Sequence, residues 1–248
     1  LLGGDISMLP KYEEAGTIYR NTNGKKIDAL KLFKKEGWNA MRLRLFVDPS
    51  QAPEEHKGEG VCQDLNYVMK LGKRIKKAGF QLMLDFHYSG KQFTPASWKG
   101  ASAQALADSV YQYTKRSLIA MKQAGAEPEM IQVGNEISFG MLWLTAKTVP
   151  TEDANWQEFI TILKHGCKAC REICPKAKII IHTEQAGKWE NTKAFYDRLE
   201  KAHLDYDIIG LSYYPMWHER IPVLHNTLNN LAERYPKKEV MIVEAAAY

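Results

Sequence analysis

The sequence predicts an α/β fold, a (β/α)8 TIM barrel formed by one catalytic domain over residues 1–248. Short apolar runs alternate with longer segments of helical periodicity, an order typical of a parallel sheet with helices packed outside it. A chain of 248 residues has the length of one such barrel, and no low-complexity tract or Pro/Gly-rich linker divides it. We therefore expect repeated strand–helix units around one core.

Apolar, β-prone runs are the expected strands. They are Gly3–Ser7, Ala40–Phe46, Gln81–His87, Met130–Glu136, Ile179–Thr183, Ile208–Tyr213 and Val240–Glu244. A closed barrel needs an eighth strand, yet the sequence stops at Tyr248, soon after Glu244. We expect the eighth unit to be missing from this sequence, because an open barrel would leave two sheet edges exposed.

Helical segments fill the intervals between these runs. They are Lys26–Glu36, Leu65–Ala78, Ala103–Ala124, Trp156–Ile173, Thr192–Lys201 and Val223–Tyr235. Gly37, Gly79 and Gly125 follow the first three segments. Glycine readily adopts the left-handed conformation that ends many helices, so we expect helix stops at these positions.

Composition argues against several classes of protein. With 45% hydrophobic and 25% charged residues the chain is ordinary for a globular protein, so disorder is not expected. The net charge of +5 is modest, and Lys and Arg alternate with acidic residues, which argues against a nucleic-acid partner. No apolar run approaches the roughly 20 residues of a membrane span, and the N-terminus has no signal-peptide pattern.

Three of the four cysteines, Cys167, Cys170 and Cys174, recur at helical spacing. A metal site would need a fourth ligand, for which His165 is the nearest candidate. Free cysteine behaves as a small apolar residue, so we expect thiols on the buried face of one helix and no metal.

The predicted strands deliver polar side chains at their carboxyl ends, which meet at one rim in a parallel barrel. Glu136 and Glu244 are the most informative, because two facing carboxyls can cleave a glycosidic bond, one as acid and the other as nucleophile or base. The other polar rim residues are Asp5, Ser7, Arg42, Arg44, Asp85, His87, Asn135, His182, Ser212, Tyr213 and Tyr214. We expect Arg44, His87 and Tyr213 to support the ionised carboxylate, and Asn135 to bind a sugar hydroxyl.

Aromatic residues supply a second signal for a sugar site, because the apolar C–H faces of sugars stack on flat side chains. Trp98, Trp143, Tyr214 and Trp217 all follow predicted strands, in loops that would surround the rim. We expect these four side chains to contact substrate.

Several strings together resemble the glycoside hydrolase family 53 endo-β-1,4-galactanases. They are Arg42-Leu43-Arg44, Leu84-Asp85-Phe86-His87-Tyr88-Ser89, Gln132-Val133-Gly134-Asn135-Glu136-Ile137, Gly140-Met141-Leu142-Trp143 and Ile209-Gly210-Leu211-Ser212-Tyr213-Tyr214-Pro215, followed by Trp217-His218. The likeness runs from Gly3 to Glu244 in the right order. It implies a retaining enzyme whose fourth strand carries the acid/base, here Glu136, and whose seventh carries the nucleophile, here Glu244.

The same resemblance implies the remaining properties. Arg44, His87, Asn135, His182 and Tyr213 match positions that line the active site. The substrate would be β-1,4-galactan, the side chain of pectic arabinogalactan, and no cofactor would be needed. The protein would be a monomer that is secreted, periplasmic or on the cell surface.

The sequence departs from the family pattern in two places. A sugar-binding loop after Tyr88-Ser89 is shorter, since Ser89-Gly90 joins directly to Lys91-Gln92 and onward to Trp98. The sequence also ends before the strand-8 aromatic and before the region where some bacterial relatives hold structural calcium.

Two alternatives stay open from the sequence. Fold and glutamates do not select the sugar, so another β-1,4 glycan such as mannan or xylan could be the substrate. A non-catalytic glycan-binding barrel would suit the shortened loop and the early end, although two intact glutamates argue against it.

Overall fold

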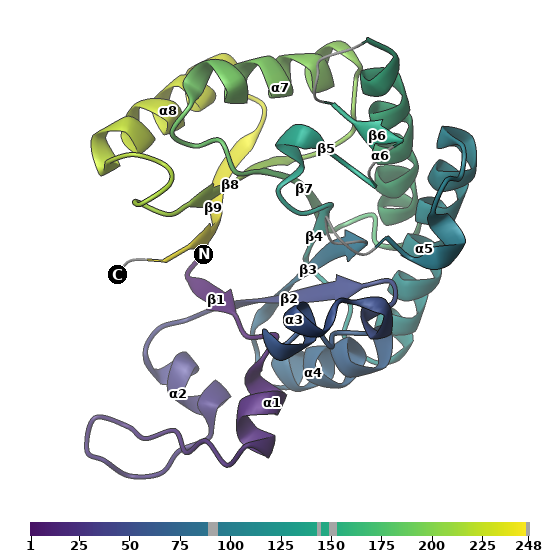
Figure 1. The fold of residues 1–248 in the computed structure, drawn as a ribbon. Coiled ribbons are helices and arrows are strands. Elements are labelled where there is room, and N and C mark those ends of the chain that lie inside the picture. Colours follow the sequence, from purple (N-terminus) through teal and green to yellow (C-terminus); the bar gives the residue numbers. More distant parts are fainter. Residues whose placement is uncertain (89–93, 143–144, 149–152, 247–248) are drawn as a thin grey trace.

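The computed structural model describes residues 1–88, 94–142, 145–148 and 153–246 of the chain. Its main sheet has seven strands, all parallel, in the order β1-β2-β3-β4-β7-β8-β9. The bounds are β1 Gly3–Asp5, β2 Ala40–Phe46, β3 Gln81–Tyr88, β4 Met130–Val133, β7 Lys178–Thr183, β8 Ile208–Tyr213 and β9 Glu239–Ala245. The sheet curves into a nearly closed barrel with helices outside it (Figure 1), so the predicted barrel is confirmed.

Each predicted strand is present, with small differences at the ends. β1 stops at Asp5, whose carboxylate accepts a hydrogen bond from the Ser7 backbone N–H at 2.9 Å and turns the chain. β4 stops at Val133, because Gly134 and Glu136 both have positive φ angles and leave the extended conformation. The loop predicted to be shortened after Ser89 lies outside the described residues.

The helices are α1 Leu9–Glu14, α2 Ala29–Lys35, α3 Glu54–Gly58, α4 Leu65–Lys77, α5 Ala103–Gln123, α6 Asp153–Ile173, α7 Trp189–Lys201 and α8 Ile221–Arg234. Asp28, Asp64 and Ser102 cap α2, α4 and α5 by accepting a backbone hydrogen bond in the first turn. The predicted stops after these helices are confirmed, since the three glycines that follow have φ angles of 89°, 80° and 75°. The sequence did not predict α1 and α3, which are too short for a periodic pattern.

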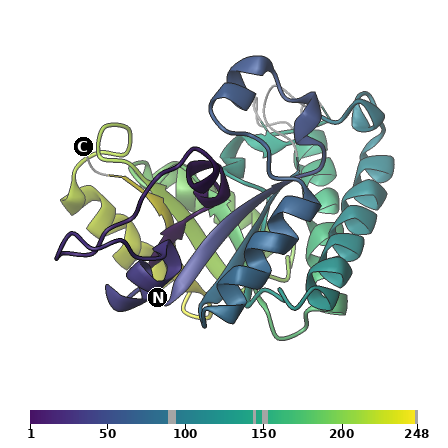
Figure 2. The same cartoon turned by 90° about the horizontal axis from the view of Figure 1, so that it is seen from below.

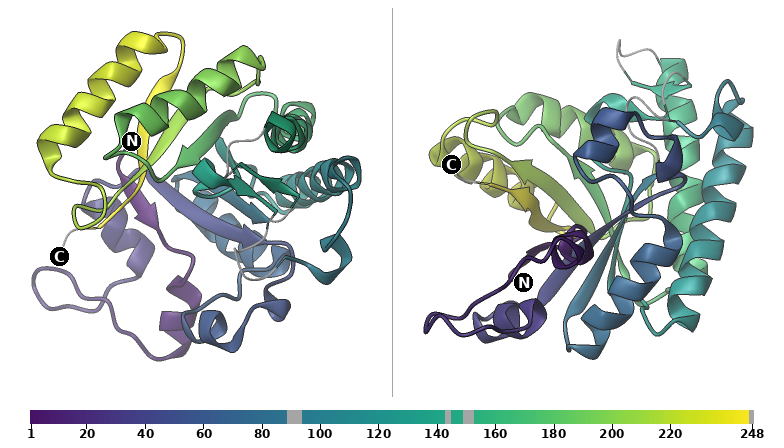
Figure 3. Two further views of the ribbon diagram at one scale, coloured as in Figure 1. Left: turned by 45° about the horizontal axis from the view of Figure 1, so that its top comes forward. Right: turned by 60° about the horizontal axis from the view of Figure 1, so that its bottom comes forward.

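The long helices pack side by side outside the sheet. Figure 2 shows α4, α5 and α6 in succession along one flank, and Figure 3 shows α7 and α8 continuing the outer layer. The thiols of Cys167 and Cys170 in α6, and that of Cys174 directly after it, are free and buried, as predicted. None of the helices in the described part of the chain is long and apolar enough to cross a membrane.

Side chains inside the barrel form an apolar layer beneath a polar one. The apolar layer contains Ala40, Met83, Met130, Ile180 and Ile208, with Met241 and Val243 packed against it. Alternate residues of a strand point to the same face, so the next inward positions on four of these strands are Arg42, Asp85, Gln132 and His182. These four polar side chains are buried, and they form the polar layer directly below the rim of the barrel.

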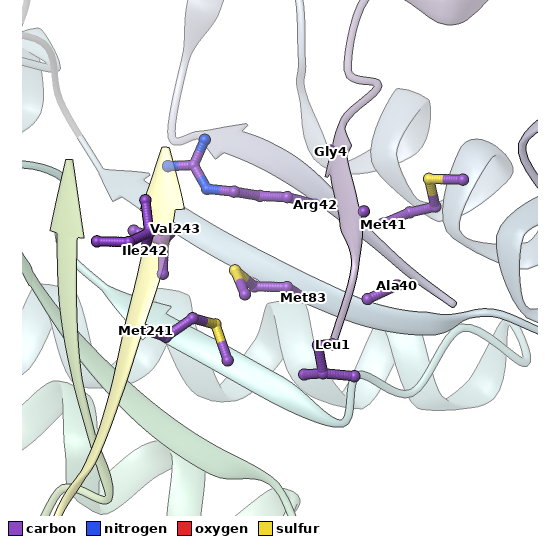
Figure 4. Close-up of a pocket in the computed structure, with 10 residues that line it drawn as sticks. Leu1, Gly4, Ala40, Met41, Arg42, Met83, Met241, Ile242 and Val243 are labelled. Atoms are coloured by element: carbon purple, nitrogen blue, oxygen red, sulfur yellow. The ribbon is translucent and has the colours of Figure 1, made fainter. Parts of the chain in front are cut away.

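A gap separates the two edge strands of the sheet. In the described residues β1 pairs only with β2, and β9 pairs only with β8, so backbone hydrogen bonds do not close the ring. A small pocket occupies this gap (Figure 4), lined by Leu1, Gly3, Gly4, Ala40, Met41, Arg42, Met83, Met241, Ile242 and Val243. Arg42 lies at the rim end of the pocket, between β1 and β9 (Figure 4).

A short hairpin of β5 (Gly140–Met141) and β6 (Ala146–Lys147) follows β4 and was not predicted, because two-residue strands carry no alternating pattern. Gly140 has a φ of 87° and ψ of −171°, a conformation almost restricted to glycine. A Cβ there would also lie 2.0 Å from the backbone oxygen of Ala146. Both constraints require glycine at this position.

Replacing Gly140 by alanine should therefore destabilise the protein more than an alanine at a glycine with open space around it. Gly125 is the matched control, because its φ is 75° but nothing lies within 4 Å of the added Cβ. We expect Gly140→Ala to lower the free energy of unfolding by about 1–3 kcal/mol more than Gly125→Ala, measured in urea. Equal losses in the two variants would contradict the steric argument.

Candidate active site

Glu136 follows the carboxyl end of β4 in an unusual backbone conformation. Its φ and ψ are 49° and 56°, in the left-handed region that few residues other than glycine adopt. Such strain is retained where the surrounding structure holds it, and it is common at functional sites. The Ser212 hydroxyl donates a hydrogen bond to Glu136 Oε1 at 2.7 Å, which aims the carboxyl toward β8.

The surroundings of Glu136 favour its protonated form. Burial is the largest cause that raises the pKa of this carboxyl, and the nearby charges of Glu244 and Glu184 raise it further. The hydrogen bond from Ser212 and the proximity of His87 act in the opposite direction, but the net pKa shift is upward. A carboxyl whose pKa is raised in this way can act as a general acid.

Glu244 lies near the end of β9 and has a different environment. Its Oε1 forms an ion pair with Arg42 Nη2 at 2.6 Å, and its Oε2 accepts a hydrogen bond from the Tyr214 hydroxyl at 3.0 Å. A carboxyl in an ion pair with a guanidinium and bonded to a hydroxyl is held in one orientation. The two glutamates therefore differ in the way required of an acid and a nucleophile.

Arg42 is the centre of a buried charge network. Its guanidinium lies 2.8 Å from Asp5 Oδ2 and 2.7 Å from Asp85 Oδ2, and it donates to Asn135 Oδ1 at 2.9 Å. Burial alone would lower the pKa of Arg42, yet the charges of Asp85, Glu244 and Asp5 raise it, so the side chain stays cationic. Burial would likewise raise the pKa of Asp5, and Arg42 with Arg44 lowers it.

The sequence placed Arg44 beside the nucleophile, and the structure gives that contact to Arg42. Both side chains point into the barrel, because they are two residues apart on β2. Arg44 lies closer to the rim, with its Nε 3.6 Å from Asp5 Oδ2, and together with His87 it lines an open cleft. His87 Nδ1 is 2.5 Å from Asp85 Oδ2. Asn135, Tyr214 and Glu244 line the same cleft.

The predicted aromatic residues lie in different environments. Tyr214 contacts Glu244, whereas Tyr213 points away from the barrel interior and donates to the backbone oxygen of Glu219 at 3.0 Å, because successive strand residues alternate. Trp98 is buried in the core against Tyr113, with ring centroids 6.3 Å apart, so little of its face can contact a sugar. Trp217 is 76% exposed after β8, and Trp143 lies outside the described residues.

Three residues at the site, Gln132, Ser212 and Glu184, had no role assigned from the sequence. Gln132 is fully buried, and its Nε2 lies 3.0 Å from Nδ1 of His182, a predicted site residue that is also fully buried. Ser212 contacts both His182 and Glu136, although the sequence gave it no role beyond its place at the rim. Glu184 directly follows β7, and burial raises the pKa of its carboxyl. The position of Glu184 directly after the predicted strand Ile179–Thr183 is the sequence signal that could have identified it as a site residue.

No group of three or more His, Cys, Asp or Glu side chains within the described ranges is arranged to hold a metal ion. The described site residues offer carboxyls, two arginines and neutral hydrogen-bonding groups.

Removing the charge of Arg42 should strongly destabilise the fold, because Asp85 would remain fully buried without its cation. We expect Arg42→Met to lower the free energy of unfolding by about 3–5 kcal/mol. Arg44→Met is the matched control, because Arg44 is partly exposed and its Nε lies 3.6 Å from Asp5 Oδ2; it should cost less than about 1 kcal/mol. Similar losses for the two variants in urea unfolding would contradict the central role of Arg42.

Comparisons with known proteins identify the family of the chain. The model of glycosyl hydrolase family 53 matches residues 1–248. A probable arabinogalactan endo-β-1,4-galactanase A of Aspergillus fumigatus is 34% identical, over 98% of this chain and 68% of its own length. An endo-β-1,4-galactanase of Bacillus subtilis is 31% identical, over 98% of this chain and 56% of its own length.

The solved structure of the Ignisphaera aggregans GH53 catalytic domain superposes with a TM-score of 0.89 at 34% identity, over 98% of this chain and 67% of that one. The chain thus spans between 56% and 68% of the length of these three proteins. Matches of this extent and identity show the family: the chain belongs to glycosyl hydrolase family 53.

Proposed function

We propose that this protein is an endo-acting, retaining glycoside hydrolase that cleaves β-1,4-galactosidic bonds in galactan and type I arabinogalactan. The family membership and the galactanase names of the relatives support the reaction and the substrate. The observation that carries the assignment of roles is the contrast between the two strand-end carboxyls. The pKa of Glu136 is raised in a buried setting, while Glu244 is ion-paired with Arg42.

In the first step a Glu244 oxygen attacks the anomeric carbon, and the bond from that carbon to the leaving oxygen breaks. Glu136 gives its proton to the leaving oxygen, so the shortened glycan departs as an alcohol. In the second step the Glu136 carboxylate takes a proton from water, and the water oxygen attacks the anomeric carbon. The bond to Glu244 breaks and releases a sugar with retained configuration.

The neighbouring residues have supporting roles in this proposal. Arg42 and Tyr214 orient Glu244 for attack through the two contacts to its oxygens. Arg44, His87 and Asn135 line the cleft and offer donors to sugar hydroxyls. Trp217 is exposed in the loop after β8, three residues after Tyr214, and its ring is suited to stacking on a sugar.

Both steps use only side-chain carboxyls and water, so we propose that no cofactor takes part. The substrate is an extended polysaccharide, which an open cleft at a barrel rim can accommodate along its length. We further propose that the protein acts as a monomer on galactan outside the cytoplasm, as the extracellular occurrence of its polymer substrate suggests.

Removing either catalytic carboxyl should abolish turnover without unfolding the protein. We expect Glu136→Gln and Glu244→Gln each to lower kcat on galactan by about 10²- to 10⁴-fold or more. The matched control is Glu233→Gln, an exposed glutamate in α8, which should keep normal activity. Near-normal release of reducing ends by either site variant, with an unchanged melting temperature, would overturn the assignment of roles.

Initial rates on purified polysaccharides test the substrate. We expect β-1,4-galactan to be hydrolysed with a kcat/KM at least about 10-fold higher than mannan or xylan, because a site that hydrogen-bonds particular hydroxyls rejects sugars that place them differently. Faster hydrolysis of mannan or xylan would identify a different glycan, and binding of galactan without release of reducing ends would identify a non-catalytic barrel.

A further inference from the structure

Buried hydrogen bonds connect the two glutamates across the barrel floor. The series of hydrogen bonds starts at Arg42, which forms an ion pair with Glu244. It passes through Gln132, His182 and Ser212 and ends on Glu136. Gln132, His182 and Ser212 are all fully buried, on β4, β7 and β8 respectively. Buried polar side chains on three strands that form one unbroken chain have few alternative partners, so the direction of each bond can be deduced.

The orientation of the Gln132 amide is the first fixed point. Its Nε2 lies 2.9 Å from Asp85 Oδ1 and 3.0 Å from the backbone oxygen of Gly134, two atoms that only accept hydrogen bonds. Its Oε1 lies 3.4 Å from both Nε and Nη2 of Arg42, which only donate. Reversing the amide would create repulsive contacts on both sides, so Nε2 faces His182 and can only donate there; its two hydrogens are shared among Asp85, Gly134, Asn135 and His182.

The tautomer of His182 follows from that orientation. Its Nδ1 faces Gln132 Nε2 at 3.0 Å and the backbone N–H of Glu136 at 3.4 Å, and both of these groups donate. Nδ1 must therefore present its lone pair. Burial, together with the charges of Arg42 and His87, holds the pKa of His182 well below its usual range, so the ring is neutral and its proton is on Nε2.

The direction of the last two bonds is then determined. His182 Nε2 lies 2.8 Å from Ser212 Oγ and donates to it. The Ser212 hydrogen is left to point at Glu136 Oε1, 2.7 Å away. In each hydrogen bond of this series the donor therefore lies on the Arg42 side and the acceptor on the Glu136 side.

We propose that Gln132, His182 and Ser212 form a one-way hydrogen-bond relay that keeps Glu136 Oε1 a permanent acceptor, so that Oε2 carries the catalytic proton. This inference rests on the proposed role of Glu136 as acid/base. Oε2 gives its proton to the leaving oxygen in the first step and accepts the proton of water in the second. The relay moves no proton itself, and His182 and Ser212 are positioning residues that act through Glu136.

The tautomer of His182 is testable without any activity measurement. In the full chain labelled with ¹⁵N-histidine, we expect the His182 resonances of a neutral ring, protonated at Nε2 and bare at Nδ1, across the pH range in which the protein is folded. His182→Gln identifies the resonances by their disappearance. A ring protonated at Nδ1, or one that becomes doubly protonated near pH 6, would reverse or break the relay and overturn the proposal, whether or not galactan is hydrolysed.

The pH dependence of kcat/KM on galactan tests the effect of the relay on Glu136. The charged or titratable groups of the described residues that face Glu136 include Glu244, Glu184, His87, His182 and Tyr214, and all remain in a Ser212→Ala variant. Loss of the hydroxyl removes a bond that favours the carboxylate, so the alkaline limb should move upward by about one pH unit. The acidic limb should stay in place.

Two variants separate this shift from a general structural effect. Ser212→Thr retains a hydroxyl and should restore the wild-type alkaline limb, even if the rate falls. Ser117→Ala makes the same change at a buried serine in α5 and should leave the profile unchanged. A Ser212→Ala profile that is lower at every pH but has an unmoved alkaline limb would overturn the relay. Lack of galactan hydrolysis by the wild-type protein would instead reject the proposed function.

Discussion

The buried guanidinium of Arg42 is the interaction on which the site depends. Three carboxylates, those of Asp5, Asp85 and Glu244, converge on this one cation from three different strands. Gathering such charges away from water costs several kcal/mol unless each is paired, so the cation and the carboxylates require one another. The same side chain orients Glu244 and sets the direction of the hydrogen bonds that reach Glu136.

The layered interior of the barrel explains how a stable fold can hold these groups. Four strands, β2, β3, β4 and β7, place an apolar residue near the amino end, such as Met83 or Ile180, and a polar one two positions later. The apolar layer excludes water from below, which strengthens hydrogen bonds and ion pairs in the polar layer above it. The alternating direction of side chains along a strand thus places apolar residues in the core and polar residues at the site.

The sequence predicted the barrel and its two strand-end glutamates because both depend on local pattern. Apolar runs marked the strands; Glu136 lies three residues after the end of β4, and Glu244 is the second-last residue of β9. Contacts between residues far apart in the sequence could not be predicted from local pattern. Arg42 and Arg44 have the same side-chain type and the same inward direction, and only the depth of each on β2 decides which one pairs with Glu244. The burial of Trp98 depends on a short 3-10 helix that packs against Tyr113, which no periodic pattern reveals.

The central claim is that Glu244 is the nucleophile of a retaining reaction assisted by Glu136. The most direct measurement is covalent trapping with an activated 2-deoxy-2-fluoro β-1,4-galactobioside, followed by mass spectrometry of the intact protein and its peptides. The account predicts one label per chain, located on Glu244, and slower labelling of an Arg42→Met variant. Labelling of another residue, or hydrolysis with inversion of the anomeric configuration, would contradict it.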